Sequence, residues 1–117
     1  MSQFTIYHNP RCSKSRQTLV ILEEHNIQPE VVLYLENTPS KQQLKEILKQ
    51  LGKSPRDILR KSEDAYKENA LSDLTLTDDA LLKAMITEPK LIERPIVVKG
   101  TKAVLGRPPE NVLELIK

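Results

Sequence analysis

The stretch FTIYHNPRCSKSRQTLVILEEHNIQPEVVLYL, residues 4–35, holds two short apolar runs on either side of a helical segment. Phe4 to Tyr7 is a β-prone run, and Val31 to Leu35 is a continuous apolar run typical of a buried strand. Leu19 to Leu22 is apolar around a full turn, which predicts a helix covered on more than one side and ended near Asn26. A strand, a helix and a strand within about 30 residues predict a parallel, right-handed crossover unit.

The middle of the chain carries the capping signals of several helices. Ser40, with glutamine three residues later, forms a capping-box pattern ahead of an apolar stripe that ends at Gly52. Ser54-Pro55 is typical of the start of a short helix. Thr77 precedes two aspartates and a further apolar stripe, which ends before Pro89. We expect these stripes to face a core.

After Arg94-Pro95 the apolar period changes to that of strands. Ile96 to Val98 and Ala103 to Leu105 predict an antiparallel hairpin around Gly100, and a last helix follows Pro108-Pro109. The order of elements predicts an α/β fold, with a four-stranded mixed sheet, flanking helices and a helical insert between strands 2 and 3. We expect a single domain over residues 1–117, with the insert at about 38–92.

Composition excludes several classes of function. Lys and Arg number 18 against 16 Asp and Glu, and aromatic residues are 3% with no Trp, which disfavours nucleic-acid binding. The apolar runs are far shorter than the roughly 20 residues that span a bilayer, and the N-terminus lacks an apolar signal core. One cysteine in 117 residues cannot form an internal disulfide. We therefore expect a soluble, cytoplasmic monomer in a reducing setting.

Cys12 falls where the first predicted strand ends and the first helix begins. Unpaired backbone N–H groups and the helix dipole favour a thiolate there, but an exposed dipole supplies only about 0.3 to 1 kcal/mol. Other groups must therefore help, and the neighbouring basic side chains, the Ser15 hydroxyl and His8 are the candidates. The alternative is a small buried hydrophobe, as most free cysteines are. The polar and basic neighbours favour a reactive thiol of lowered pKa.

Spacing separates the motifs that such a cysteine could belong to. A cysteine phosphatase needs Cys-x5-Arg, but Thr18 stands where the arginine would be. A dithiol oxidoreductase needs a second cysteine where Ser15 stands, so any two-electron thiol cycle must use an external thiol. One cysteine and two histidines without ligand spacing do not make a metal site. We expect no bound metal and no bound cofactor.

Five motifs in order resemble one family over essentially the whole chain. They are HNPRCSKSR from His8, LYLEN from Leu33, ILRKSEDAY from Ile58, TDDALL from Thr77 and ERPIVV from Glu93. Together they resemble the glutaredoxin-dependent arsenate reductases. The resemblance implies a thioredoxin-like fold with a helical insert, in which the proline that opens the third strand is cis and lies beside the reactive cysteine. That proline would be Pro95.

The resemblance also implies roles for individual residues. Cys12 would be the nucleophile, and His8 and Ser15 would support its thiolate. Arg60, Arg94 and Arg107 would bind the oxyanion, because guanidinium groups match its oxygens bidentately. Taken singly, each arginine is better explained as a solvated surface charge, and only their joint match favours a binding role. The implied co-substrates are arsenate and glutathione, with glutaredoxin as the protein partner.

The chain departs from the arsenate-resistance enzymes in two respects. Arg11, Ser13 and Lys14 are larger or more basic than the residues that flank the nucleophile in those enzymes, and the chain is shorter. The extra charge could strengthen anion capture or indicate a different anion or thiol substrate. Two other functions stay open: a glutathione-linked monothiol oxidoreductase, from the spacing of Cys12 and Ser15, and a non-enzymatic RNA-polymerase-binding regulator of the same fold.

Overall fold

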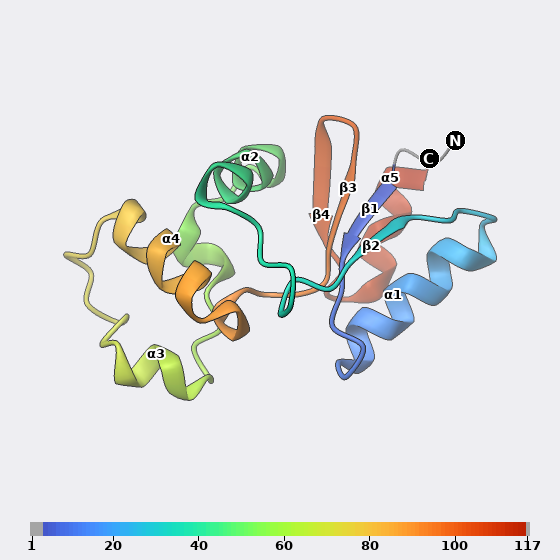
Figure 1. The fold of residues 1–117 in the computed structure, drawn as a ribbon. Helices are drawn as coiled ribbons and strands as arrows, with labels where there is room; N and C mark the ends of the chain where they lie inside the picture. The colour runs from blue at the N-terminus through green and yellow to red at the C-terminus, as the bar shows by residue number, and fades with distance from the viewer. Residues whose placement is uncertain (1–3, 117) are drawn as a thin grey trace. The chain divides into compact units, whose positions relative to one another are not determined.

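The computed structural model describes residues 4–116, and the chain divides into two compact units. One unit consists of the residues up to 37 and those from 94 onward, and the other consists of residues 38–93 (Figure 1). The second unit is the helical insert expected between strands 2 and 3. That the whole chain forms a single domain stays a prediction.

The first unit contains a four-stranded mixed sheet, as the sequence predicts. Its strands are β1 (Phe4–Tyr7), β2 (Glu30–Val32), β3 (Ile96–Lys99) and β4 (Lys102–Leu105), in the order β2-β1-β3-β4. β1 runs parallel to β2, and the helix α1 (Ser13–Glu24) makes the crossover between them. β3 lies antiparallel to both β1 and β4, so the predicted β3–β4 hairpin is confirmed.

One hydrophobic cluster ties the sheet to the helices of this unit. The C-terminal turns η3 (Pro109–Val112) and α5 (Leu113–Ile116) share it with α1 and the two central strands (Figure 1). Burying each of its larger apolar side chains contributes about 1.5–3 kcal/mol. Its buried members are Phe4, Ile6, Leu22, Val97, Val112 and Leu115. This packing holds β1 and the β3–β4 hairpin in place, and therefore also fixes the points at which their loops begin.

β2 is shorter and more exposed than predicted. The expected strand from Val31 to Leu35 pairs only as far as Val32, and Leu33 accepts backbone hydrogen bonds from Glu36 and Asn37 at 2.9 and 2.8 Å. Val31 is 44% exposed. The reason is that β2 is an edge strand with one neighbour, so an apolar run here is not buried on both faces.

The prediction that α1 is covered on more than one side holds in part. Leu22 and Thr18 are fully buried. Leu19 and Ile21 pack against the hydrophobic cluster, and η3 contacts the helix beside the sheet. The helix leaves Val20, on its solvent-facing stripe, 48% exposed. Its expected end at Asn26 is confirmed, since that residue adopts a left-handed φ of 60° just after the helix.

The second unit consists of short helices. They are α2 (Lys41–Leu51), η1 (Pro55–Ile58), α3 (Asp64–Glu68), α4 (Asp78–Thr87) and η2 (Pro89–Leu91). The predicted capping box of α2 is confirmed: Ser40 Oγ accepts the Gln43 N–H at 3.2 Å, and Gln43 Oε1 accepts the Ser40 N–H at 2.8 Å. Gly52 ends α2 at a φ of 68°.

Two further features of this unit bear on the sequence predictions. Thr77 Oγ1 accepts the Ala80 N–H at 3.1 Å, so the predicted cap of α4 is confirmed. The helix α3 was not predicted, because it buries none of its residues and so has no apolar stripe. In the described part of the chain, no helix combines the length and apolar character needed to cross a membrane.

Candidate active site

Cys12 is the residue at which the chain turns from the β1 loop into α1. Its backbone is extended, with φ of −95° and ψ of 123°, and it occupies the N-cap position. Its N–H donates to the Asn9 carbonyl at 3.0 Å, which fixes the loop. The first N–H groups of a helix have no acceptor within the helix, so they are available to an anion at this end. The side chain is 9% exposed.

Opposing effects act on the pKa of the Cys12 thiol. Burial is the largest of them and raises the pKa. The backbone N–H of Ser15, the Arg94 guanidinium, the backbone N–H of Lys14 and the Arg107 guanidinium all lower it, and together they outweigh burial. The sulfur makes no regular side-chain cap hydrogen bond, so this stabilisation is spread over several groups. The pKa lies below that of an ordinary thiol, which favours the nucleophilic thiolate.

Arg94 and Arg107 reach the thiol from the two ends of the β3–β4 hairpin. Arg94 precedes β3 and Arg107 follows β4, and the pairing of Ile96 with Leu105 brings these ends together. Arg107 Nη1 lies 3.9 Å from Cys12 Sγ and donates to the Arg94 carbonyl at 3.2 Å. The structure therefore brings two of the three predicted arginines to the cysteine.

Both arginines stand directly before a cis proline. The Arg94-Pro95 bond is cis, as the family resemblance implies for Pro95. The Arg107-Pro108 bond is cis as well, which the sequence analysis did not predict. The Gly106 N–H donates to the Pro95 carbonyl at 2.9 Å, so the two cis segments are tied to each other beside the thiol.

The side chains of His8 and Ser15 form a hydrogen bond with each other. His8 Nδ1 and Ser15 Oγ are 2.6 Å apart, and Ser15 Oγ also accepts the Asn9 N–H at 3.0 Å. Both side chains are buried. Burial, and then the charge of Arg16, hold the pKa of His8 below its ordinary value. His8 is therefore a neutral partner of Ser15 at pH 7, and Ser15 acts on the thiolate through its backbone N–H.

Arg60 belongs to the 38–93 unit, apart from the other predicted site residues in the chain. Its Nη1 lies 2.6 Å from Glu63 Oε2, and its Nε lies 3.7 Å from Glu93 Oε1. Its backbone N–H donates to the Leu91 carbonyl at 2.8 Å. These contacts hold the guanidinium in place within its own unit. Its role in oxyanion binding stays a prediction.

Thr18 and Gly106 were missed as site residues. Thr18 Oγ1 donates to the Lys14 carbonyl at 2.8 Å and lies 3.4 Å from the Gly106 carbonyl. A Cβ on Gly106 would lie 2.5 Å from Thr18 Oγ1. This close approach sets where Arg107, the next residue, leaves the hairpin. The glycine directly before Arg-Pro-Pro was the available signal in the sequence.

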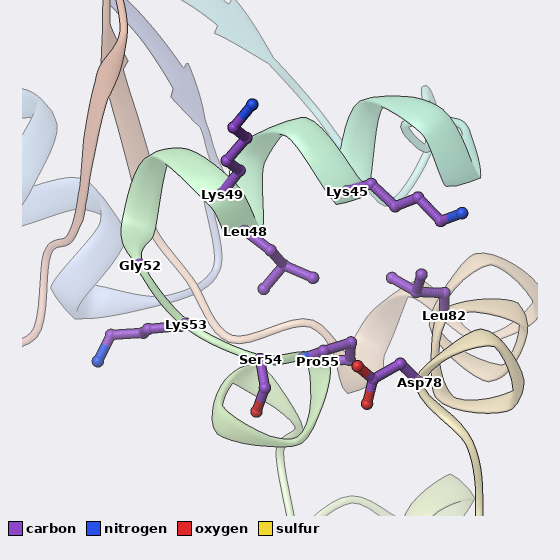
Figure 2. Close-up of a pocket in the computed structure, with 9 residues that line it drawn as sticks. All are labelled: Lys45, Leu48, Lys49, Gly52, Lys53, Ser54, Pro55, Asp78 and Leu82. Atoms are coloured by element: carbon purple, nitrogen blue, oxygen red, sulfur yellow. The ribbon is translucent and has the colours of Figure 1, made fainter.

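Two surface pockets are large enough to hold a small ligand. One, of about 340 Å³, lies on the loop before Cys12 and is lined by His8, Asn9, Pro10, Arg11, Leu33, Leu35 and Glu36. The other, of about 490 Å³, lies within the 38–93 unit, between α2 and α4, and is drawn in Figure 2. There Leu48 and Leu82 point toward one another, whereas the ammonium groups of Lys49 and Lys53 point away from them. Its lysines do not converge on one point, as an oxyanion site requires.

Residues 4–116 contain no group of three or more His, Cys, Asp or Glu side chains that could hold a metal ion. The chemistry that the described residues offer is that of a thiolate beside guanidinium groups and the start of a helix. Such a set can bind a small oxyanion and attack it as a nucleophile.

Comparison with known proteins identifies the family of the chain. Residues 7–115 match the ArsC family. The chain belongs to this family. A protein of Escherichia coli K12, "Uncharacterized protein YfgD", is 55% identical over 115 residues, which are 97% of each chain. The "Arsenate reductase" of Neisseria meningitidis Z2491 is 49% identical over 113 residues, covering 96% of this chain and 97% of that protein.

A solved structure of similar sequence has the same fold. "Arsenate reductase from Vibrio cholerae" is 52% identical, with a TM-score of 0.94 over 97% of this chain and 98% of that chain. Together with the strand order found above, this confirms the thioredoxin-like fold that the motifs imply.

Proposed function

We propose that this protein reduces arsenate to arsenite, with Cys12 as the nucleophile. The observation that carries the proposal is Arg107 Nη1 at 3.9 Å from a thiol whose pKa is lowered. The matching proteins of Neisseria meningitidis and Vibrio cholerae are named arsenate reductase, which supports this choice of oxyanion. Arg94 and Arg107 bind the arsenate oxygens together with the N–H groups at the start of α1. Arg60 supplies a third guanidinium.

The first chemical step forms a covalent adduct. The Cys12 thiolate attacks arsenic(V), an S–As bond forms, and one arsenate oxygen leaves as water after protonation. His8 and Ser15 support this step by holding the loop and the first turn of α1, through their 2.6 Å hydrogen bond. Guanidinium groups and helix N–H groups cannot distinguish arsenate from phosphate by charge and shape. Selectivity comes from the next step, because phosphate has no comparable two-electron reduction.

The second step uses an external thiol, which we take to be glutathione. Its thiolate attacks Cys12 Sγ, the S–As bond breaks, and the electron pair stays on arsenic, which leaves as arsenite. Glutaredoxin then takes the glutathionyl group and frees Cys12. Two thiols are oxidised to one disulfide, arsenic(V) is reduced to arsenic(III), and one water is released. A chain with one cysteine needs such external thiols. We take the protein to be a monomer in the cytoplasm, whose reducing conditions supply these thiols.

One assay tests the proposal: arsenite formation from arsenate by the purified protein with glutathione and glutaredoxin. Wild-type protein should turn over, and Cys12→Ser should not. An absence of arsenite in the wild-type reaction would contradict the proposal. If arsenate is inert but a disulfide substrate is reduced, the protein is a monothiol oxidoreductase, a function that the basic flank of Cys12 also suits.

The arginine assignment has its own test in the same assay. Arg94→Ala and Arg107→Ala should each lower kcat/KM for arsenate several-fold to a thousandfold, the loss expected for about 1 to 4 kcal/mol of oxyanion contact. Lysine at either position should rescue only in part, because the planar fork is lost. Lys102→Ala, an exposed charge on β4, is the matched control and should leave kcat/KM unchanged.

A further inference from the structure

The pocket on the loop before Cys12 is lined by residues that, apart from His8, have no role in the steps above. Its volume of about 340 Å³ lies within the range of roughly 300–1,000 Å³ found for small-molecule sites. The loop that forms one wall, His8 to Arg11, runs directly into the reactive cysteine. A ligand seated here therefore contacts Arg11, the residue directly before Cys12 in the chain.

The lining of this pocket combines apolar surface with two opposite charges. Leu33 and Leu35 form the apolar part, and Leu35 is 38% exposed. Arg11 and Glu36 are both exposed and line the same pocket. Among the residues that the structure describes, neither charged side chain belongs to an ion pair. One cation and one anion are thus available to a ligand, beside a surface that an aliphatic chain can cover.

Hydrogen bonds hold both walls in place before any ligand binds. The Arg11 N–H donates to Asn9 Oδ1 at 3.0 Å, and Arg16 Nη1 donates to the Pro10 carbonyl at 2.9 Å. On the other wall, the Glu36 N–H donates to the Leu33 carbonyl at 2.9 Å. A preformed site loses less free energy to ordering when its ligand binds.

We infer that this pocket binds the second thiol of the proposed reaction, as a small peptide thiol that carries both an ammonium and a carboxylate group. Arg11 contacts a carboxylate of that ligand, Glu36 contacts its ammonium group, and Leu33 and Leu35 pack on its aliphatic part. Arsenate matches this lining less well, because Glu36 repels an anion and Leu33 and Leu35 offer an oxyanion no contact. The inference rests on the proposed function, since it gives a place to the thiol whose sulfur attacks Cys12 Sγ and releases arsenite.

A binding experiment tests the pocket without arsenate. S-methylglutathione, whose sulfur cannot react, is titrated into the ¹⁵N-labelled protein. Backbone amide shifts should be largest in the loop before Cys12 and in residues 33, 35 and 36. Arg11→Ala and Glu36→Ala should each raise Kd by about twofold to fivefold, as for exposed ion pairs. Lys102→Ala and Glu23→Ala, exposed charges that do not line the pocket, should leave Kd unchanged.

Kinetics with two thiols gives the second readout. In arsenate turnover, Arg11→Ala and Glu36→Ala should raise KM for glutathione and leave KM for arsenate unchanged. With 2-mercaptoethanol, which has no charged group, both variants should match the wild-type rate. The inference is overturned if the shifts fall on other residues, or if both variants bind S-methylglutathione as tightly as the wild type. Binding at the pocket without any arsenate turnover would instead overturn only the proposed function.

Discussion

At the scale of single residues, the reactivity of Cys12 depends on the balance between burial and stabilisation of its thiolate. Burial alone would leave a protonated, inert thiol. No single partner reverses this, because two backbone N–H groups and two guanidinium groups each lower the pKa. Removing one of these groups should therefore raise the Cys12 pKa, but the remaining groups should still favour the thiolate.

The pH dependence of alkylation tests this balance. Only the thiolate reacts with iodoacetamide, so a lowered pKa lets Cys12 be labelled at a lower pH than a free thiol such as N-acetylcysteine. Arg107→Ala removes one of the groups that lower the pKa, so the midpoint of labelling should move to higher pH. Arg107→Lys keeps the charge and should move it less. A wild-type midpoint equal to that of N-acetylcysteine would refute the balance described here.

Substitution of Ser15 distinguishes the contribution of its hydroxyl to stability from the contribution of its backbone N–H to the Cys12 pKa. Ser15→Ala removes the hydroxyl that bonds His8 and accepts the Asn9 N–H, so buried His8 and half-buried Asn9 each lose a hydrogen bond. The variant should lower the free energy of unfolding in urea by roughly 1–3 kcal/mol. Its labelling midpoint should stay near that of the wild type, because the backbone N–H that acts on the thiolate remains. Ser13→Ala, at an exposed position, is the control for stability.

At the scale of elements, the site depends on how closely α1 approaches the end of the hairpin. A Cβ on Gly106 would lie 2.5 Å from Thr18 Oγ1 and 2.7 Å from Pro95 Cγ. Neither neighbour can move easily, since Thr18 is fully buried and Pro95 is buried directly before β3. The glycine is needed here for space, because its φ is not in the left-handed region.

Gly106→Ala should therefore affect both stability and the thiol. Overpacking of this kind costs about 1–3 kcal/mol of unfolding free energy, and the shift of Arg107 should raise the pH midpoint of Cys12 labelling. Gly100→Ala is the control: its φ of 59° makes alanine strained by roughly 1–2 kcal/mol, but a Cβ there meets no other atom. It should lose stability with no change in labelling. Adding Thr18→Ala to Gly106→Ala should restore part of the loss.

The elements also show which local signals determine structure. The cap of α2 at Ser40 and its left-handed end at Gly52 were predictable. In each case the residue type that the backbone requires lies within a few residues of the helix end itself. The extent of β2 was not predictable, because an apolar run such as Val31 to Leu35 has the same sequence in a buried central strand and at an exposed edge. Burial there depends on the number of neighbouring strands, which no local pattern encodes.

At the scale of the whole molecule, the predicted site residues come from three distant parts of the sequence. The placement of Cys12 at a helix start followed from the strand–helix–strand order. The meeting of Arg94 and Arg107 depends on the register of the hairpin, which places Ile96 opposite Leu105. The sequence located the hairpin but not this register, so only the family resemblance named the two arginines. The pocket on the Cys12 loop was not predictable, because it needs the turn that follows β2.

Arg60 tests whether residues 38–93 take part in the reaction. It is not among the groups that lower the Cys12 pKa, and two carboxylates hold its guanidinium. If it binds arsenate, Arg60→Ala should raise KM for arsenate by roughly tenfold to a hundredfold, the loss of a charge-assisted contact of about 1.5–3 kcal/mol, and leave the alkylation profile of Cys12 unchanged. Glu63→Gln removes one of the carboxylates but keeps the guanidinium, so it should change KM far less. Equal KM values for wild type and Arg60→Ala would remove Arg60 from the site and leave oxyanion binding to Arg94, Arg107 and the start of α1.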